Sequence, residues 1–543
     1  MPCLFAPLAA LLLSSCGGSD VAASAGPALP KGIAAVMAKP RYTSAKSKWS
    51  LVVMDAKTGQ LVYALEPDRL SLTGSVRKLF SVGTALDTLG PHHRFTTSVY
   101  RNGAAAAGGV LAGDLVLVAS GDLTFGGRAK SDGTFDFTDF DHNEAPSFGG
   151  SGLTPQDPLA ALNDLARQVR ASGIQRVSGD VVIDDRLFKS FRVLNGNTLI
   201  SPIDINENLI DVTVTPGLNI GDAAMLDWRP KVSGFSVRGR PSTIAPALQP
   251  DLAAYGDSFG SISLNCLGLA SCAGTLSSSA SLAPGTIPVG YVAQLIGTTQ
   301  YVGVLKAEDP ATLARIAFID ELARAGVTVT AATVARNATN RLPAPESLAD
   351  SSRVAQFVSL PYSEYARLIL KVSLNTGANL SLMHVGLSQR QRTREGALAA
   401  ERSLLTNNMG LDPASFNFPT NGSGSPDSLA SARTTAKLLA SMSTRPSYAV
   451  YRQALPLLGV DGSLASVGKN VVGKEHMSMK SGATVDNGQL VAISLAGYIE
   501  AKSGRPLTFA LFVNDAGPIS DIGDSLQVFE DEAQIAGIVY ELN

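Results

Sequence analysis

The chain has 543 residues, of which 45% are hydrophobic and 17% are charged, and its formal net charge is −2. This balance excludes a disordered or fibrous protein and allows two or three domains, each with its own core. No tract rich in Lys and Arg is long enough to indicate a nucleic-acid surface, so no nucleic-acid partner is expected.

The N-terminus has the pattern of an export signal. A short apolar run from Pro2 to Leu13 is followed by small residues and Cys16. The run is too short to span a bilayer as a helix, so residues 1–16 are interpreted as a signal peptide and the Ala/Pro/Gly-rich residues 17–31 as a linker. The stretch Leu13-Ser14-Ser15-Cys16 is similar to a bacterial lipobox, which predicts a lipid anchor on Cys16. The alternative is an ordinary signal peptide, because no Lys or Arg precedes the apolar run.

Two distant segments predict one α/β domain. Near the start, a hairpin is expected over Trp49–Met54 and Leu61–Leu65, followed by a helix over Gly74–Leu89. The far C-terminal segment predicts strands and a closing helix (472–479, 490–499, 507–513 and 520–542), and the patterns over 363–439 are mainly helical. Strands at both ends with helices between them predict a catalytic domain built from residues 32–95 and 351–543.

The middle of the chain has a different texture. Short runs such as Val110–Val118 and Val177–Ile183 are broken by Gly, Asp and Ser, which predicts a β-rich insertion. We expect a domain II from 96–213 and 301–350 and a domain III from 214–300. Cys266 and Cys272 fall in this region and can form a small disulfide loop in an exported chain. The histidines show no metal-ligand spacing, and neither a metal nor another cofactor is expected.

The first candidate for chemistry is Ser75-Val76-Arg77-Lys78, at the start of an expected helix. Residues three apart share a helix face, which puts the Lys78 amine within hydrogen-bond reach of the Ser75 hydroxyl. A lysine with a lowered pKa can take the proton of the serine, and backbone N–H groups at the helix start can stabilise an oxyanion. Alone, the pattern also fits a capped helix with a surface lysine.

Two later motifs supply polar groups that suit the same reaction. Ser373-Leu374-Asn375 offers a hydroxyl for proton relay and an amide that can hold a substrate carbonyl. Lys480-Ser481-Gly482-Ala483, at the end of an expected strand, offers a cation and a hydroxyl for a carboxylate. In the same motif, Gly482 allows close backbone approach and the Ala483 N–H can complete an oxyanion hole.

In this order the three motifs resemble the Ser-x-x-Lys, Ser-x-Asn and Lys-[Ser/Thr]-Gly set of penicillin-binding proteins and serine β-lactamases. The gap between Ser75 and Ser373 is much longer than the gap between Ser373 and Lys480. A long insertion after the first motif is similar to the class C low-molecular-mass penicillin-binding proteins, the D-alanyl-D-alanine carboxypeptidase/endopeptidase family. Further stretches between Lys48 and Glu541 share this resemblance: Leu89-Gly90-Pro91, Gly113-Asp114-Leu115, Asn206-Glu207-Asn208 and Leu455-Pro456.

The resemblance implies an α/β fold, in which a transpeptidase-like domain of antiparallel sheet and helices carries a β-rich insertion after the Ser-x-x-Lys helix. It implies a penicillin-binding serine carboxypeptidase that trims peptidoglycan stem peptides in the periplasm or cell envelope. Ser75 would be acylated and Lys78 would be its base, while Ser373 and Lys480 would pass the proton to the departing D-alanine. Asn375 would position the substrate amide.

The resemblance also implies how the substrate is held. Ser481 would bind the terminal carboxylate, and the N–H groups of Ser75 and Ala483 would form an oxyanion hole beside Gly482. Asp184 would bind the amino end of a diaminopimelate side chain, with the capping of a turn as the alternative.

Four positions depart from the family pattern. Leu374 and Asn379 stand where carboxylates are usual, Asn421 opens a motif that usually begins with Asp, and Ala483 lacks a hydroxyl. These changes remove supporting polar groups, so a catalytically weak homologue that binds peptidoglycan stays open as an alternative, as does a β-lactamase. Carboxypeptidase and endopeptidase cleavage need the same residues and are not distinguished.

Overall fold

The computed structural model describes residues 28–106, 108–142, 151–193, 198–246, 263–265, 286–293, 297–422 and 426–543. The predicted signal peptide, the lipidation of Cys16 and the pairing of Cys266 with Cys272 lie outside this part. Within it, no helix combines the length and the apolar character needed to cross a membrane.

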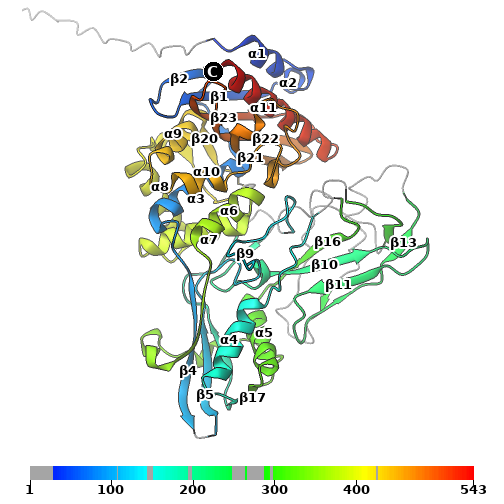
Figure 1. The fold of residues 1–543 in the computed structure, drawn as a ribbon, viewed down its shortest axis with the longest axis vertical. Coiled ribbons are helices and arrows are strands. Elements are labelled where there is room, and N and C mark those ends of the chain that lie inside the picture. Colours follow the sequence, from blue (N-terminus) through cyan, green and yellow to red (C-terminus); the bar gives the residue numbers. More distant parts are fainter. Residues whose placement is uncertain are drawn as a thin grey trace, which may run out of the picture.

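Both ends of the chain contribute to one antiparallel sheet (Figure 1). Its five strands have the order β2-β1-β23-β22-β21, so the first hairpin lies against the C-terminal strands as expected. The strand bounds are Lys48–Asp55 (β1), Leu61–Leu65 (β2), Met477–Asp486 (β21), Gln489–Glu500 (β22) and Pro506–Asn514 (β23).

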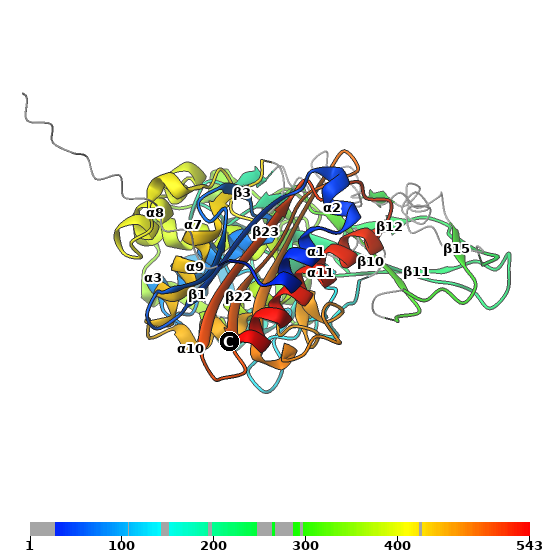
Figure 2. The ribbon, with the colours of Figure 1, turned by 90° about the horizontal axis from the view of Figure 1, so that it is seen from above.

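Alternate residues of β1 face two different cores. Leu51 and Val53 pack with α1 (Lys31–Met37), α2 (Pro40–Ala45) and α11 (Ile522–Leu542), whereas Val52 and Met54 pack against the helices of the other face. Figure 2 shows α1 and α11 along the same side of the sheet. Because successive side chains of a strand point to opposite faces, this one apolar run contributes to the hydrophobic cores on both sides of the sheet.

The second face of the sheet is covered by a layer of helices. They are α3 (Arg77–Leu89), α6 (Tyr362–Val372), α7 (Asn375–Ser388), α8 (Arg394–Asn407), α9 (Ala432–Ser443) and α10 (Tyr448–Ala454). Of these, α3, α6 and α7 carry or flank the first two motifs. A small sheet of β3 (Leu70–Leu72), β20 (Leu429–Ser431) and β19 (Phe416–Asn417) leads into the one-turn 3₁₀ helix η1 (Gly74–Val76), which precedes α3.

A β-rich insertion follows the α3 helix, as expected, and projects away from the five-stranded sheet (Figure 1). Its main sheet contains β4 (Thr96–Ala106), β5 (Val110–Val118), β6 (Arg176–Val177), β7 (Val181–Asp184), β17 (Thr328–Val329) and β18 (Arg353–Val358). The helices α4 (Ala160–Ala171) and α5 (Pro310–Arg324) pack together with this sheet. A second sheet contains β10 (Leu209–Thr215), β11 (Met225–Arg229) and β16 (Tyr301–Lys306). The domain boundaries given above remain predictions.

Two expected strands differ from the observed ones. The run Val177–Ile183 is divided between β6 and β7, and the gap between the two strands holds the residues that interrupt the apolar run, Ser178-Gly179-Asp180. The strand expected over 472–479 instead begins at Met477 and continues to Asp486. The Lys480 motif consequently lies inside a strand and not at its end.

Candidate active site

The first two motifs meet at the amine of Lys78. Its Nζ atom donates to Oγ of Ser75 at 2.6 Å and to Oγ of Ser373 at 3.2 Å. Lys78 is fully buried and Ser75 is 8% exposed. The helical spacing of Ser75 and Lys78 thus has the consequence expected from the sequence, and the fold adds the second hydroxyl.

Ser373 occupies a turn between two helices. It has the left-handed conformation, with φ 66° and ψ 34°, after the end of α6 and before α7. A residue with a side chain is uncommon in this region and is retained where its surroundings determine it. Here the turn is closed by the hydrogen bond from Leu374 N–H to the Ile369 carbonyl at 3.0 Å, and it keeps Ser373 beside Lys78.

Two glycines allow β21 to touch the segment that carries the nucleophile candidate. A Cβ atom on Gly482 would lie 2.5 Å from the Thr73 carbonyl oxygen and 2.8 Å from the Ser75 nitrogen. A Cβ atom on Gly74, which has φ +48°, would lie 2.7 Å from the Ala483 nitrogen. Only glycine permits this approach, which brings the backbone N–H groups of Ser75 and Ala483 to the same junction.

The side chains of the third motif have defined partners. Lys480 is fully buried, and its Nζ donates to the Ser481 carbonyl oxygen at 2.7 Å. The Ser481 hydroxyl oxygen lies 3.0 Å from that of Ser463. Sequence reasoning missed Ser463. It directly follows Gly462, whose backbone lies against the carbonyl group of Lys371, and Lys371 comes two residues before Ser373 of the second motif.

The positions that depart from the family pattern have structural contacts. Leu374 is fully buried in the apolar core. The Asn379 amide donates to the Asn375 carbonyl at 2.9 Å, within α7. The Asn421 amide donates to the Ala378 carbonyl at 2.7 Å and its oxygen accepts from the Ser81 hydroxyl, so it joins α7 to α3.

Asp427 is a further residue of the site that sequence reasoning missed. Its Oδ2 atom accepts from the Gly74 N–H at 3.1 Å and from the Thr484 hydroxyl at 2.7 Å. Burial raises the pKa of this carboxyl, and its hydrogen bonds and the charge of Lys78 act in the opposite direction. Asp427 therefore joins the segment before Ser75 to β21, a relationship that no local sequence signal reveals.

Asp184 lies at the end of β7 and has local partners. Its Oδ1 accepts from the Arg186 backbone N–H at 3.1 Å, and the Arg186 guanidinium binds both carboxylate oxygens at 2.8 and 2.7 Å. No contact among the described residues joins Asp184 to the three motifs. A role for it in substrate binding stays a prediction.

Asp141, His142 and Glu207 form a buried cluster in the insertion with the ligand types of a metal site. The Arg128 guanidinium binds both Asp141 oxygens, at 2.8 and 2.7 Å, and Glu207 at 2.5 Å. Its Nη2 also lies 3.1 Å from His142 Nε2. A cation is already supplied by the chain, so the cluster is an ion-pair network and not a candidate metal centre.

The His142 imidazole is part of this network. Its Nδ1 lies 3.1 Å from an Asp211 carboxylate oxygen. Burial by itself would lower the pKa of His142, but the charges of Asp211 and Asp141 act more strongly and raise it to about 10. The surrounding carboxylates thus favour the charged form of the imidazole.

Comparison with known proteins relates most of the chain to one group. The family model of the D-Ala-D-Ala carboxypeptidase 3 (S13) family matches residues 29–252 and 297–533. A D-alanyl-D-alanine carboxypeptidase from Actinomadura sp. (strain R39) is 25% identical over 503 residues, which cover 90% of this chain and 82% of that protein.

Solved structures show the same fold. Penicillin-binding protein 4 from Haemophilus influenzae matches with a TM-score of 0.62 and 16% identity, over 94% of this chain and 98% of that chain. The structure of that protein complexed with a β-lactam matches with a TM-score of 0.61 and 16% identity, over 94% and 99% of the two chains. The arrangement of an antiparallel sheet, covering helices and a large insertion is thus the penicillin-binding fold that the motifs indicated.

Proposed function

The chain belongs to the D-Ala-D-Ala carboxypeptidase 3 (S13) family, and from that membership we propose how its residues carry out serine-type D-Ala-D-Ala carboxypeptidase chemistry. The observation that carries the proposal is the position of Lys78, whose amine contacts the hydroxyls of Ser75 and Ser373 at 2.6 and 3.2 Å. A buried amine between two hydroxyls can take a proton from one and return it through the other.

Acylation begins when Ser75 Oγ attacks the carbonyl carbon of the penultimate D-alanine and Lys78 accepts the hydroxyl proton. The carbonyl oxygen becomes an oxyanion that the backbone N–H groups of Ser75 and Ala483 stabilise. The peptide bond to the terminal D-alanine then breaks, and its nitrogen receives a proton through Ser373 and Lys480. Water attacks the resulting ester, and this second step releases the shortened peptide and restores the Ser75 hydroxyl.

Substrate recognition rests on the third motif and on Asn375. The Ser481 hydroxyl and the Lys480 amine are hydrogen-bond donors that suit the terminal carboxylate of a stem peptide. The Asn375 amide suits the peptide group beside the scissile bond. A β-lactam presents a strained amide and a carboxylate in similar positions, so we expect it to acylate Ser75.

Export to the cell envelope follows from the proposed substrate, because peptidoglycan lies outside the cytoplasmic membrane. The apolar run before Cys16 supports a cleaved signal, and the lipobox-like sequence supports a lipid on this cysteine. The mass of the mature N-terminal peptide tests both points. An unmodified end cleaved at another residue would contradict lipidation.

Release of D-alanine from a purified stem pentapeptide tests the enzymatic proposal. The parent chain is expected to release D-alanine and to bind fluorescent penicillin covalently, and Ser75→Ala is expected to do neither. Retention of the pentapeptide without turnover by the parent would favour the binding-only alternative. Cleavage of cross-linked dimers, measured beside pentapeptides, separates endopeptidase from carboxypeptidase activity. Rapid hydrolysis of a chromogenic β-lactam would favour a β-lactamase.

A further inference from the structure

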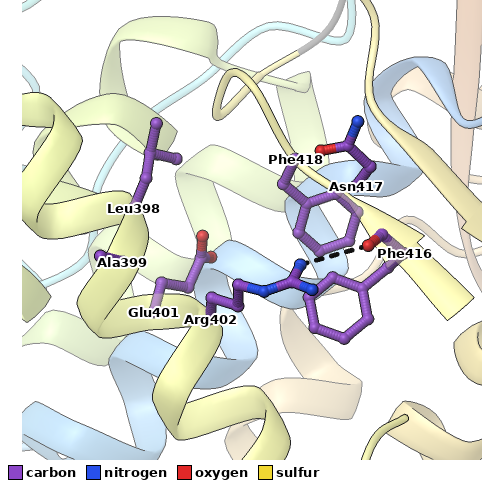
Figure 3. A pocket seen from close by; sticks show the side chains of 7 residues that line it. All are labelled: Leu398, Ala399, Glu401, Arg402, Phe416, Asn417 and Phe418. Atoms are coloured by element: carbon purple, nitrogen blue, oxygen red, sulfur yellow. Dashed lines mark hydrogen bonds between the residues drawn. The ribbon is translucent and has the colours of Figure 1, made fainter. Parts of the chain in front are cut away.

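A cavity of about 360 Å³ lies between α8 and the segment around β19 (Figure 3). None of its lining residues belongs to the three motifs. Its volume is within the range of small-molecule sites. The lining combines aliphatic, aromatic and polar side chains: Leu398, Ala399, Glu401, Arg402, Phe416, Asn417 and Phe418.

Arg402 supplies an exposed cation to this cavity. Its guanidinium carbon lies 4.9 Å from the centre of the Phe416 ring. Its described hydrogen bonds are to the carbonyl oxygens of Phe416 and Pro413, at 3.3 and 2.7 Å, so N–H groups remain for a ligand. Within the described part of the chain, no carboxylate lies within ion-pair distance of Arg402. An arginine with an aromatic ring beside it suits the two oxygens of a carboxylate.

The other charged group of the lining is already neutralised. Both Glu401 oxygens bind the Arg77 guanidinium, and the two side chains are at most 2% exposed. The Arg77 guanidinium also lies 4.0 Å from the centre of the Phe418 ring. Because Glu401 is paired, the charge of Arg402 favours a negatively charged ligand, while Phe418 and Leu398 offer apolar contact.

The cavity is placed behind the catalytic helix. The Arg77 guanidinium binds Glu401 of α8, whereas the amine of the next residue, Lys78, contacts Ser75 and Ser373, so the two side chains point to different sides of α3. The segment that forms the aromatic wall continues from Phe418 to Gly422, which packs so closely on Asn375 that a Cβ atom would lie 2.8 Å from its amide oxygen. A ligand in the cavity would thus contact residues that support both the first and the second motif.

We propose that this cavity is a second binding site for a small amphipathic carboxylate. The carboxylate pairs with Arg402, and the apolar body packs against Phe418 and Leu398. The site is separate from the proposed peptidase site, and its occupancy influences acylation through Arg77 and the 418–422 segment.

Calorimetric titration of the mature chain with 3-phenylpropanoate tests the binding site. We expect saturable binding with a Kd on the order of 1 mM, as for a fragment-sized ligand. The neutral 3-phenylpropanamide and the variant Arg402→Gln should each weaken binding about tenfold or more. The exposed Lys57 provides a matched control, because Lys57→Gln makes the same charge change elsewhere and should bind like the parent.

Ser481→Ala distinguishes this cavity from the motif residues, which also suit a carboxylate. Unchanged affinity in Ser481→Ala together with loss in Arg402→Gln supports the proposal. Loss in Ser481→Ala with none in Arg402→Gln, or no saturable binding by the parent, would overturn it. If Arg402→Gln lowers the melting temperature, Leu398→Trp, which fills the cavity from its apolar side, replaces it in the same comparison.

The influence on acylation is measured separately, since it alone rests on the proposed function. Saturating 3-phenylpropanoate should change the rate at which fluorescent penicillin labels the parent by about fivefold or more, and should leave Arg402→Gln unaffected. Equal changes in both proteins would overturn the link between the cavity and Ser75.

Discussion

The Nζ atom of Lys78 donates a hydrogen bond to Oγ of Ser75 at 2.6 Å, with the lysine side chain fully buried. This pair is local in the sequence, and the fold adds Ser373, whose Oγ accepts a hydrogen bond from the same amine at 3.2 Å.

Replacement of this amine should abolish most acylation. In Lys78→Met the side chain keeps a similar length but cannot accept the Ser75 proton, so we expect the labelling rate with fluorescent penicillin to fall about 10²- to 10⁴-fold. Stopped samples separated by electrophoresis give the rate, and a melting curve checks the fold. Labelling at the parent's rate would remove Lys78 from the mechanism.

Gly482→Ala should push the backbones of β21 and η1 apart. The new methyl group would lie 2.8 Å from the Ser75 nitrogen and 2.5 Å from the Thr73 carbonyl oxygen, so one backbone must move. Displacement of an oxyanion donor typically lowers the rate about 10²- to 10³-fold. We expect this loss in the rate constant for D-alanine release, with a smaller effect on KM. A normal rate would show that the two N–H groups do not act together.

Asp427→Asn tests the carboxylate that bridges Gly74 and Thr484. The Oδ2 atom accepts from Gly74 and Thr484 while Oδ1 accepts from the Ser428 N–H at 2.7 Å, so the single oxygen of an amide cannot keep the bonds on both sides. Each buried hydrogen bond lost costs about 1–3 kcal/mol. We expect acylation to slow about tenfold or more, a change equal to about 1.4 kcal/mol in the activation free energy. Asp350→Asn is the matched control, because its side chain is 84% exposed. Thr484→Val should share the defect of Asp427→Asn, and independent effects would contradict the bridge.

The Arg77–Glu401 ion pair should be important for stability. Both side chains are buried, so Glu401→Gln leaves an uncompensated charge and is expected to lower the free energy of unfolding by about 3–5 kcal/mol. Urea unfolding measures the change. The double variant Arg77→Met/Glu401→Leu removes both charges and should recover part of the loss. The account would be contradicted if the double variant lost more free energy of unfolding than Arg77→Met and Glu401→Leu lose when their separate losses are added.

The His142 network predicts sensitivity to alkaline pH. The folded-state pKa of His142 is about 10, above the ordinary value of 6.5. Protonation of His142 therefore stabilises the fold fully below about pH 6.5, and this contribution is lost as the pH rises through about 10. Melting temperatures between pH 7 and 10 should fall more steeply for the parent than for His142→Gln. The partly exposed His476 gives the control His476→Gln, which should follow the parent; parallel curves for the parent and His142→Gln would contradict the raised pKa.

Local patterns were sufficient for much of the fold. The mostly apolar run from Trp49 to Met54 predicts a strand, and the helix from Gly74 predicts that Ser75 and Lys78 share a face, because both patterns depend on neighbouring residues. The strand bearing Lys480 begins at Met477 and not at Val472, since hydrophobic runs specify the existence of an element better than its ends.

The sequence by itself determined the order of the three motifs, the residue types they offer and the presence of a long insertion, because these are properties of the chain as written. Only the tertiary structure decided that Gly482 meets Ser75, that Asp427 bridges to Thr484 and that Arg402 faces a cavity behind α3. Each of these relationships joins segments far apart in the chain. Such contacts form when the burial of both sheet faces brings the two chain ends together, and no local periodicity records which residues will then be neighbours.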